Sequence, residues 1–309
     1  MNSAPLFELD GVPVGGNAIF VTAKDGTQIR AAYWHGGERG TVYLLPGRAE
    51  YIEKFGRLIA KLQDRNLNVV VIDWRGQGMS DRHDGRRDRG YVESFQHYQQ
   101  DLQAVLDAPV IKALPGPRLL FSHSMGGCIG LRALVDGLGV DAAVFSGPMW
   151  GLKASKSYIL MMKAVRMLGR PFGKHKSLLP GHEPTYYVSV TPFEGNELTN
   201  DADHYAMFQS QLAAEPDLGL GGPTIQWAVE AVNEMNSLLH STVPDIPILT
   251  FLGKEDIVVD VEPVKSRAPA FPNGQFELIE FCQHDVWMET PAVQKQVWDI
   301  TDRFLAQIL

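Results

Sequence analysis

Short runs of β-branched and other apolar residues alternate with longer amphipathic stretches along most of this chain. Most of these runs are continuously apolar, as expected of strands that are buried on both faces of a sheet. The alternation predicts an α/β fold with a mostly parallel eight-stranded sheet flanked by helices. The expected strands are Ala18 to Thr22, Ile29 to Trp34, Thr41 to Leu45, Val69 to Trp74, Leu119 to Ser122, Ala142 to Phe145, Ile248 to Leu252 and Phe276 to Phe281. The expected helices are Ile52 to Arg65, Phe95 to Lys112, Met125 to Asp136 and Ala292 to Ile308.

The alternation stops between Pro148 and Thr242, where helix-like segments follow one another with Gly/Pro punctuation and no clear strand. We therefore expect a helical cap (residues 148–242) inserted after the sixth strand of a core domain (residues 1–147 and 243–309). The cap is divided in charge. Residues 153–176 hold seven basic and no acidic residues, whereas residues 177–242 hold nine acidic residues and no Lys or Arg.

The composition is that of an ordinary globular protein, with 45% apolar and 21% charged residues. A net charge of −8 argues against nucleic acid as a partner, because the polyanion would be repelled. No apolar run approaches the ~20 residues of a membrane span, and no secretory signal is readable. We expect a cytoplasmic protein in which Cys128 and Cys282 are buried thiols.

Ser124 lies where an apolar strand runs directly into a helix that begins with small residues, Met125-Gly126-Gly127. On so sharp a strand-to-helix turn a serine hydroxyl is presented at the edge of the sheet. The next backbone N–H and the helix N-terminus then point toward any developing negative charge. Glycines are needed here because the helix must pass close to the strand. Ser124 is therefore the predicted nucleophile, although Ser122 stands where the usual GxSxG pattern has its first glycine.

A serine nucleophile needs a base, and the base needs a carboxylate to orient it. In this kind of sheet they follow in the order Ser, Asp or Glu, His. Asp256 lies in the loop after one late strand, and His284 lies in the loop after the next. Glu255 is a rival for the acid, but the usual spacing after the glycine favours Asp256. We expect Ser124, Asp256 and His284 to converge at one edge of the sheet.

The tetrahedral intermediate of acyl transfer also needs N–H donors. The loop after the third predicted strand reads Pro46-Gly47-Arg48, which puts the backbone N–H of Arg48 near that of Met125. Arg48 and Met125 are therefore the predicted oxyanion-hole donors, each worth roughly 2.7–4 kcal/mol of barrier.

Four segments together resemble a known family: Pro46 to Phe55, Asp73 to Ser80, Ser122 to Gly127, and Gly253 to Asp256 with His284. They look like the α/β-hydrolase fold. More closely, they resemble the bacterial lysophospholipase (PldB-type) and monoacylglycerol lipase group, the serine aminopeptidase S33-type hydrolases. The match covers nearly the whole chain. The departures, Pro46-Gly47 and Ser122, are similar to the PldB-type members, and the segment Asp73 to Ser80 is expected to form a structural turn beside Ser124.

The resemblance implies a serine carboxylic-ester hydrolase that cleaves lysophospholipids or monoacylglycerols through an acyl-enzyme. No metal and no organic cofactor is expected. The expected partner is a small lipid ester, and the basic segment of the cap offers a peripheral contact with the inner face of the membrane. A merely solvated helix face explains that basic segment equally well.

Apolar cap residues are expected to line a slot for the acyl chain above Ser124, with packing of the cap itself as the alternative. They are Met149, Trp150, Tyr158, Ile159, Leu160, Met161, Met162, Met167, Leu168 and Phe172. Among these and the basic residues, the predicted substrate contacts are Trp150, Tyr158, Met162, Lys163 and Arg166.

Three other functions remain open at this stage. An exopeptidase of the proline-iminopeptidase kind uses the same triad and anchors a free amine with acidic residues, for which the cap offers Glu194, Glu197, Asp201 and Asp203. A general carboxylesterase needs no lipid preference. A ligand-binding protein without catalysis predicts a damaged triad, which the intact Ser, Asp and His argue against.

Overall fold

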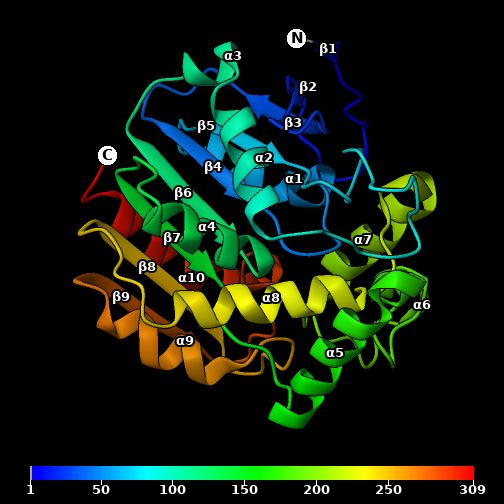
Figure 1. Cartoon of the computed structure of the whole chain (residues 1–309). Helices are drawn as coiled ribbons and strands as arrows, with labels where there is room; N and C mark the ends of the chain where they lie inside the picture. The colour runs from blue at the N-terminus through cyan, green and yellow to red at the C-terminus, as the bar shows by residue number, and fades with distance from the viewer. Residues whose placement is uncertain (1) are drawn as a thin grey trace.

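The computed structural model describes residues 2–309, which fold around one twisted sheet (Figure 1). The sheet has nine strands in the order β1-β2-β3-β5-β4-β6-β7-β8-β9. Their bounds are Asn2–Ser3 (β1), Asn17–Thr22 (β2), Gln28–Trp34 (β3), Thr41–Leu45 (β4), Asn68–Ile72 (β5), Arg118–His123 (β6), Ala142–Ser146 (β7), Pro247–Gly253 (β8) and Asn273–Ile279 (β9).

All eight expected strands are present, but the predicted count of eight is one too low. The additional strand, β1, has two residues and pairs antiparallel with β2, with Asn2 opposite Phe20. A two-residue polar strand has no apolar periodicity by which a sequence could reveal it. The strands from β5 to β9 in the sheet order are parallel, whereas β2 and β3 run antiparallel to their neighbours.

Helices cover both faces of the sheet. On the near face in Figure 1 lie α2 (Gln96–Leu106), α4 (Met125–Val135), α8 (Ile225–Leu238) and α9 (Val261–Arg267). On the far face lie α1 (Gly56–Gln63) and α10 (Pro291–Leu305). The expected helix Phe95 to Lys112 is two helices, because α3 (Pro109–Lys112) begins anew at a proline. The residue before that proline, Ala108, is extended (φ −60°, ψ 126°).

Strand β6 shows how the sheet divides the core. Leu120 packs into the cluster under α2, α4 and α8, while Leu119 and Phe121 pack into the cluster under α1 and α10. Side chains alternate between the faces of a strand, so both faces of this buried strand must be apolar. The apolar runs of the sequence are therefore explained by a sheet that is covered on both sides.

Between β7 and β8 the described chain contains helices and turns, with isolated bridges but no strand of the sheet. The main helices are α5 (Lys156–Gly169), α6 (Tyr187–Val190), α7 (Ala202–Ala214) and α8. Helix α8 also packs against the core, where Nε of Arg132 in α4 lies 2.6 Å from Oε1 of Glu234. The end of the cap at residue 242 stays a prediction, since α8 contributes to the core beneath the preceding helices.

Candidate active site

Ser124 occupies a strained turn between β6 and α4. Its φ of 51° and ψ of −119° lie outside the conformations that serine ordinarily adopts. The helix starts immediately afterwards and passes very close to β4: a Cβ added to Gly126 would lie 2.1 Å from the carbonyl oxygen of Leu45. The apolar strand, the serine and the glycines thus produce the sharp turn that the sequence predicts.

His284 and Asp256 form a buried pair. Nδ1 of His284 lies 2.7 Å from Oδ2 of Asp256, and both residues are buried. The other oxygen, Oδ1 of Asp256, accepts the backbone N–H of Val258 at 2.9 Å. The rival acid, Glu255, is exposed and accepts a hydrogen bond from Asn200 at 3.2 Å. The structure therefore pairs Asp256, and not Glu255, with the histidine.

The charges of the pair shift both pKa values. Burial lowers the pKa of His284, but the negative charges of Asp256, Asp285 and Glu50 outweigh burial and raise it above its ordinary value. Burial raises the pKa of Asp256, but His284 and two backbone N–H groups outweigh burial and lower it. A histidine with raised basicity beside an ionised aspartate is suited to accept a proton from a hydroxyl.

The end of β7 connects the pair to the serine turn. The carbonyl of Ser146 accepts the backbone N–H of Ser124 at 3.1 Å. A Cβ added to the next residue, Gly147, would lie 3.1 Å from Nδ1 of His284 and 3.3 Å from Oδ2 of Asp256. The three predicted catalytic residues thus follow β6, β8 and β9 at the same edge of the sheet.

The predicted oxyanion loop lies against Ser124, since a Cβ added to Gly47 would be 2.9 Å from Cβ of the serine. Within residues 2–309, the backbone N–H groups of Arg48 and Met125 have no protein acceptor. Donors without an acceptor beside the nucleophile are what an oxyanion hole requires.

Two residues of the segment Asp73 to Ser80 fasten this loop. The indole N–H of Trp74 donates to the carbonyl of Pro46 at 2.8 Å. The side chain of Gln77 donates to the carbonyl of Gly47 at 3.0 Å and accepts the N–H of Ala49 at 3.1 Å. The predicted structural role of the segment therefore includes holding the oxyanion loop.

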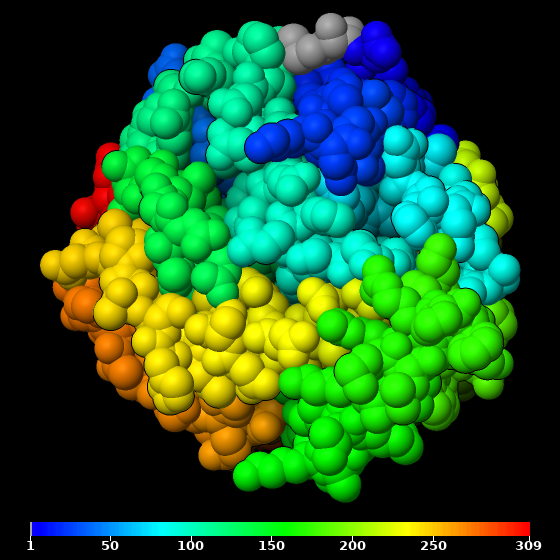
Figure 2. Space-filling view, viewed as in Figure 1, coloured from blue at the N-terminus to red at the C-terminus, as the bar shows by residue number. Residues whose placement is uncertain are grey.

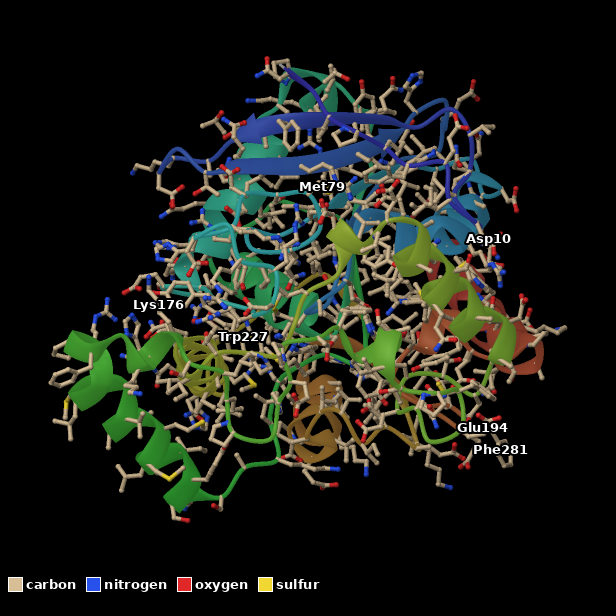
Figure 3. The ribbon with its side chains drawn as sticks, turned by 90° about the vertical axis from the view of Figure 1, so that its right-hand side faces the viewer. Asp10, Met79, Lys176, Glu194, Trp227 and Phe281 are labelled. Atoms are coloured by element: carbon tan, nitrogen blue, oxygen red, sulfur yellow. The ribbon has the colours of Figure 1, made fainter. Side chains whose placement is uncertain are left out.

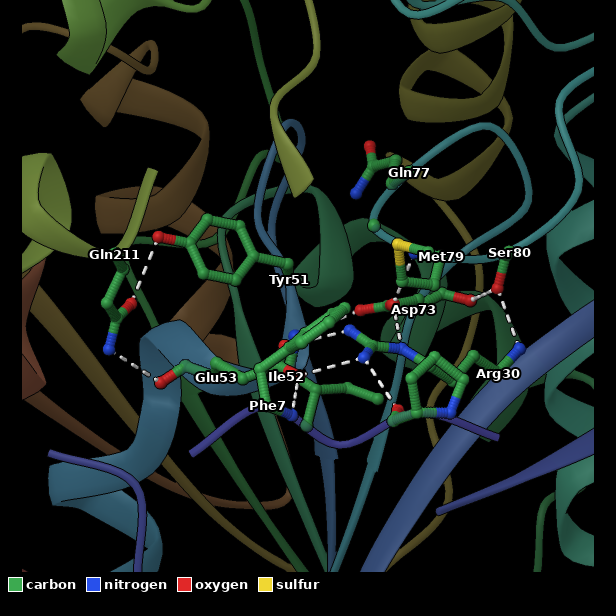
Figure 4. Close-up of polar contacts among 12 residues, drawn as sticks. Phe7, Arg30, Tyr51, Ile52, Glu53, Asp73, Gln77, Met79, Ser80 and Gln211 are labelled. Atoms are coloured by element: carbon green, nitrogen blue, oxygen red, sulfur yellow. Dashed lines mark hydrogen bonds and ion pairs between the residues drawn. The ribbon is translucent and has the colours of Figure 1, made fainter. Parts of the chain in front are cut away.

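Asp73 itself belongs to a second buried network (Figure 4). Its carboxylate accepts Nε–H of Arg30 at 2.6 Å and the backbone N–H of Ile52 at 2.9 Å. The guanidinium of Arg30 also pairs with Glu53 at 2.8 Å. This network ties β3 and β5 to the turn that follows the oxyanion loop, so the motif positions the site without touching the reacting atoms.

The predicted substrate contacts in the cap have other partners. Trp150 is buried against Phe145 and Phe271, and its indole N–H donates to the carbonyl of Gly127 at 3.1 Å. Met162 is buried, and Tyr158 is half-buried, in the same core cluster. Trp150 is therefore a core residue, which corrects the expectation that its ring lines the substrate slot.

Arg166 forms an ion pair with Glu230 of α8, and this pair fastens α5 to the helix beneath it. Lys163 is half-buried and makes no ion pair within residues 2–309. The contact found for Arg166 differs from its predicted role in substrate binding.

The expectation of an apolar slot above Ser124 is also corrected, because five of the residues predicted to line it face outward. They are Leu160, Met161, Met167, Leu168 and Phe172, with exposed fractions of 47–80%. Figure 2 shows α5 and the turns after it as a lobe beside α8, and Figure 3 shows α5 at the outer margin of the molecule. The sequence shows that these residues are apolar but not the direction in which they point.

The acidic residues of the cap are engaged or exposed. Asp201 caps α7 by accepting the backbone N–H of His204 at 2.8 Å, and Asp203 pairs with Arg57 at 2.7 Å. Glu194 and Glu197 are exposed, and Glu194 lies at the surface in Figure 3. None of the four is a buried anchor for a substrate amine.

Sequence reasoning missed four buried ionisable residues beside the site: Glu50, Lys54, His123 and Asp285. The available signal was their adjacency to predicted site residues, since His123 precedes Ser124 and Asp285 follows His284. Within residues 2–309, His123, His284 and Asp285 are the one group whose ligand atoms lie close enough to share a metal ion, within 4.8 Å of one another. Lys54 already holds Oδ2 of Asp285 at 2.7 Å, so a cation occupies that position.

Comparison with known proteins identifies the family of this chain. Residues 36–291 match the family model described as "Serine aminopeptidase, S33". The chain belongs to this hydrolase family. Among curated relatives in sequence, the probable lysophospholipase L2 of Haemophilus influenzae is 26% identical over 90% of this chain and 88% of its own. Lysophospholipase L2 of Escherichia coli K12 is 30% identical over 71% of this chain and 64% of its own.

Solved structures of low sequence identity share the fold of this S33 hydrolase. A soluble variant of monoglyceride lipase from Saccharomyces cerevisiae covers 98% of this chain and 100% of its own, with a TM-score of 0.75 at 18% identity. A carboxyl esterase from Bacillus coagulans gives the same TM-score at 16% identity and covers 96% of this chain and 99% of its own. The α/β-hydrolase fold expected from the sequence is confirmed.

Proposed function

We propose that this S33 hydrolase is a serine carboxylic-ester hydrolase that cleaves the acyl ester of lysophospholipids or monoacylglycerols. Ser124 is the nucleophile, His284 the general base and Asp256 the residue that orients the base. The observation that carries the proposal is the buried pair of His284 and Asp256 at the sheet edge that bears the strained turn of Ser124.

The reaction proceeds in two steps. Nε2 of His284 takes the proton of the Ser124 hydroxyl while Oγ attacks the ester carbonyl, and the tetrahedral oxyanion accepts the N–H groups of Arg48 and Met125. His284 then gives its proton to the leaving alcohol, which departs and leaves the acyl-enzyme. Water, deprotonated by His284, hydrolyses the acyl-enzyme and regenerates the serine. Asp256 keeps the imidazole in the required tautomer and stabilises its cation.

The substrate class is supported by the relatives, two of which are named lysophospholipase L2, and by the lack of a buried acidic anchor among the four cap residues that an exopeptidase could have used. A solved structure of the same fold is named monoglyceride lipase. These relatives favour an ester of a single acyl chain over a peptide.

We further propose that the outer surface of α5 contacts an anionic membrane surface. Leu160, Met167 and Leu168 are each 68% exposed and lie on one side of the helix. Lys156 and Lys163 lie on the same helix and Lys174 in the turn after it, and the three make no ion pair within residues 2–309. Exposed apolar side chains beside unpaired lysines suit a bilayer interface, which offers both an apolar layer and negative charge. No helix in residues 2–309 has both the length and the hydropathy to span a bilayer.

Parallel assays test the substrate class. Purified protein is given a lysophospholipid, a monoacylglycerol, a short p-nitrophenyl ester and an N-terminal prolyl anilide at equal concentrations. The proposal predicts that kcat/KM is highest for one of the two lipid esters. Faster cleavage of the anilide would establish the exopeptidase, and faster cleavage of the short ester would establish a general carboxylesterase.

A further inference from the structure

Glu50, Lys54, His123 and Asp285 form a buried charge cluster that the proposed mechanism does not use. Nζ of Lys54 lies 2.7 Å from Oδ2 of Asp285 and also pairs with Glu50. Nε2 of His123 lies 2.9 Å from Oδ1 of Asp285 and 3.6 Å from Oε1 of Glu50. Each side chain is at most 6% exposed, so water screens these charges little.

The cluster contacts three segments of the proposed active site. Glu50 accepts the backbone N–H of Gly47 and so holds the oxyanion loop. The ring of His123, the residue before Ser124, lies 4.8 Å from the ring of His284. Asp285 follows His284 directly, and its backbone N–H donates to the carbonyl of Leu198 at 2.8 Å. One set of ion pairs therefore joins the donor loop, the nucleophile turn and the histidine loop.

The buried carboxylates of the cluster have nitrogen partners. Nζ of Lys54 pairs with both Glu50 and Asp285, which satisfies the requirement that buried charges be paired. The ring of His123 lies between Ser146 and Asp285, with Nδ1 3.0 Å from the carbonyl oxygen of Ser146 and Nε2 2.9 Å from Oδ1 of Asp285.

Stability alone does not account for such a cluster. Two carboxylates, an ammonium group and an imidazole lose their hydration on burial, and well-packed apolar residues of similar volume often stabilise a fold equally well or better. A buried cluster that contacts all three parts of a reaction site has a second use, since its charges are fixed relative to the reacting atoms.

We propose that Asp285 and Lys54 are positioning residues of the ester-hydrolysis reaction, which set the electrostatic environment of His284 and keep the oxyanion loop aligned with Ser124. The inference rests on the proposed function. Neither residue is assigned a contact with the substrate. Both act through His284 and through Glu50.

The charges have opposite effects on His284. The carboxylates that act on its ring are Asp256, Asp285 and Glu50, and the ring of His123 lies beside it. Lys54 pairs with two of these carboxylates, Asp285 and Glu50, and the phenol of Tyr186 lies near the same three groups. Removing the negative charge of Asp285 lowers the pKa of His284, because less negative charge then stabilises the imidazolium. Removing the positive charge of Lys54 raises that pKa. A purely structural role gives no reason for two shifts of opposite sign.

The test is the pH dependence of kcat/KM on a short neutral p-nitrophenyl ester for the wild type, Asp285→Asn and Lys54→Met. The acid limb of the profile reports the base of the free enzyme. We expect that limb to move to lower pH in Asp285→Asn and to higher pH in Lys54→Met, each by on the order of one pH unit. Limbs that stay in place, or that move in the same direction, would overturn the inference.

Control variants separate charge from folding. Lys295→Met and Asp302→Asn remove exposed charges on α10 and should leave the limb unmoved. If thermal melting shows that Lys54→Met does not fold, two other variants replace it. Lys54→Arg must keep the acid limb of the wild type, and Glu50→Gln must move the acid limb to lower pH. Failure of either result overturns the inference. Labelling of wild-type Ser124 by a fluorophosphonate tests the proposed function separately. If Ser124 is not labelled, the proposed ester-hydrolase function is wrong. If Ser124 is labelled but the acid limbs of the variants stay in place, only the inference about Asp285 and Lys54 is wrong.

Discussion

Nδ1 of His284 lies 2.7 Å from Oδ2 of Asp256, while the adjacent carboxylate of Glu255 is exposed and hydrogen-bonded to Asn200. Two acidic residues next to each other in the sequence therefore have different surroundings. The backbone of the turn after β8 makes the difference, because the N–H groups of Val258 and Val259 fix the carboxylate of Asp256.

Replacing these two acids separately should give unequal effects. Asp256→Asn should lower kcat by roughly 10⁴-fold, the scale seen when a triad aspartate is lost, because the imidazole then takes the wrong tautomer. Glu255→Gln should retain near-normal kcat and serves as the matched control. Steady-state rates on a soluble ester measure both, and a larger loss in Glu255→Gln would show that the acid is wrongly assigned.

The pH dependence of turnover should report the raised pKa of His284. Burial lowers that pKa, but Asp256, Asp285 and Glu50 raise it above the ordinary 6.5. A base must be unprotonated to act, so kcat/KM should fall as the pH drops through this value, with a midpoint above 6.5. Asp256 stays ionised throughout because its pKa is lowered. A midpoint clearly below the ordinary histidine value would contradict the electrostatics of the site.

The sequence predicted the strands well, and it placed Ser124, Asp256 and His284 at the ends of strands, because these signals are local. An apolar run marks a strand, and the sharp turn at Ser124 needs glycines within three residues. The buried charge cluster carries only a weak signal of this kind, the adjacency of His123 to Ser124 and of Asp285 to His284. Lys54 and Asp285 are 231 residues apart in the sequence, and isolated charged residues are usually solvated. Only the fold brings them together.

Helix α5 shows a different limit of prediction from the sequence. Its apolar spacing is visible in the sequence, but both sides of the helix carry apolar residues. The side that faces α8 is selected by the contacts of Met162 and by the ion pair between Arg166 and Glu230, so Leu160 and Leu168 face outward. Periodicity gives the faces of a helix, whereas tertiary packing decides which of them is buried.

Adding a methyl group to Gly126 should disturb the site through packing. Its Cβ would lie 2.1 Å from the carbonyl oxygen of Leu45 and 2.6 Å from that of Pro46, so α4 must move away from the oxyanion loop. We expect Gly126→Ala to lower the free energy of unfolding by about 1–3 kcal/mol and to reduce turnover. Gly139→Ala, where nothing lies within 4 Å, is the control. Denaturant unfolding compares them, and equal stability of the two variants would contradict this account.

Charge reversal at the start of α5 and in the turn after it tests the membrane contact. Lys156→Glu combined with Lys174→Glu should weaken binding to phosphatidylglycerol vesicles by about 1 kcal/mol or more per residue, because attraction is replaced by repulsion. Vesicle sedimentation measures the binding, and Lys295→Glu on α10 is the matched exposed control. Binding that is unchanged in the double variant would leave α5 as a solvated helix.

Substitution of Leu168 and Phe172 by serine separates the apolar contribution. Both side chains are exposed, 68% and 80%, so little packing is lost on substitution. Binding to vesicles should weaken, whereas the rate on a soluble short ester should not change. An equal loss on both substrates would indicate damage to the fold of the cap and would contradict a surface role.

The central claim is that Ser124 is an activated nucleophile, and covalent labelling tests it most directly. The wild type and Ser124→Ala are each treated with a fluorophosphonate, digested and mapped by mass spectrometry, with melting curves to establish that both are folded. We predict a single adduct on the peptide that contains Ser124 in the wild type, no adduct in Ser124→Ala, and loss of lysophospholipid hydrolysis in that variant. An adduct on another residue, or a Ser124→Ala variant that still hydrolyses lysophospholipid, would contradict the account.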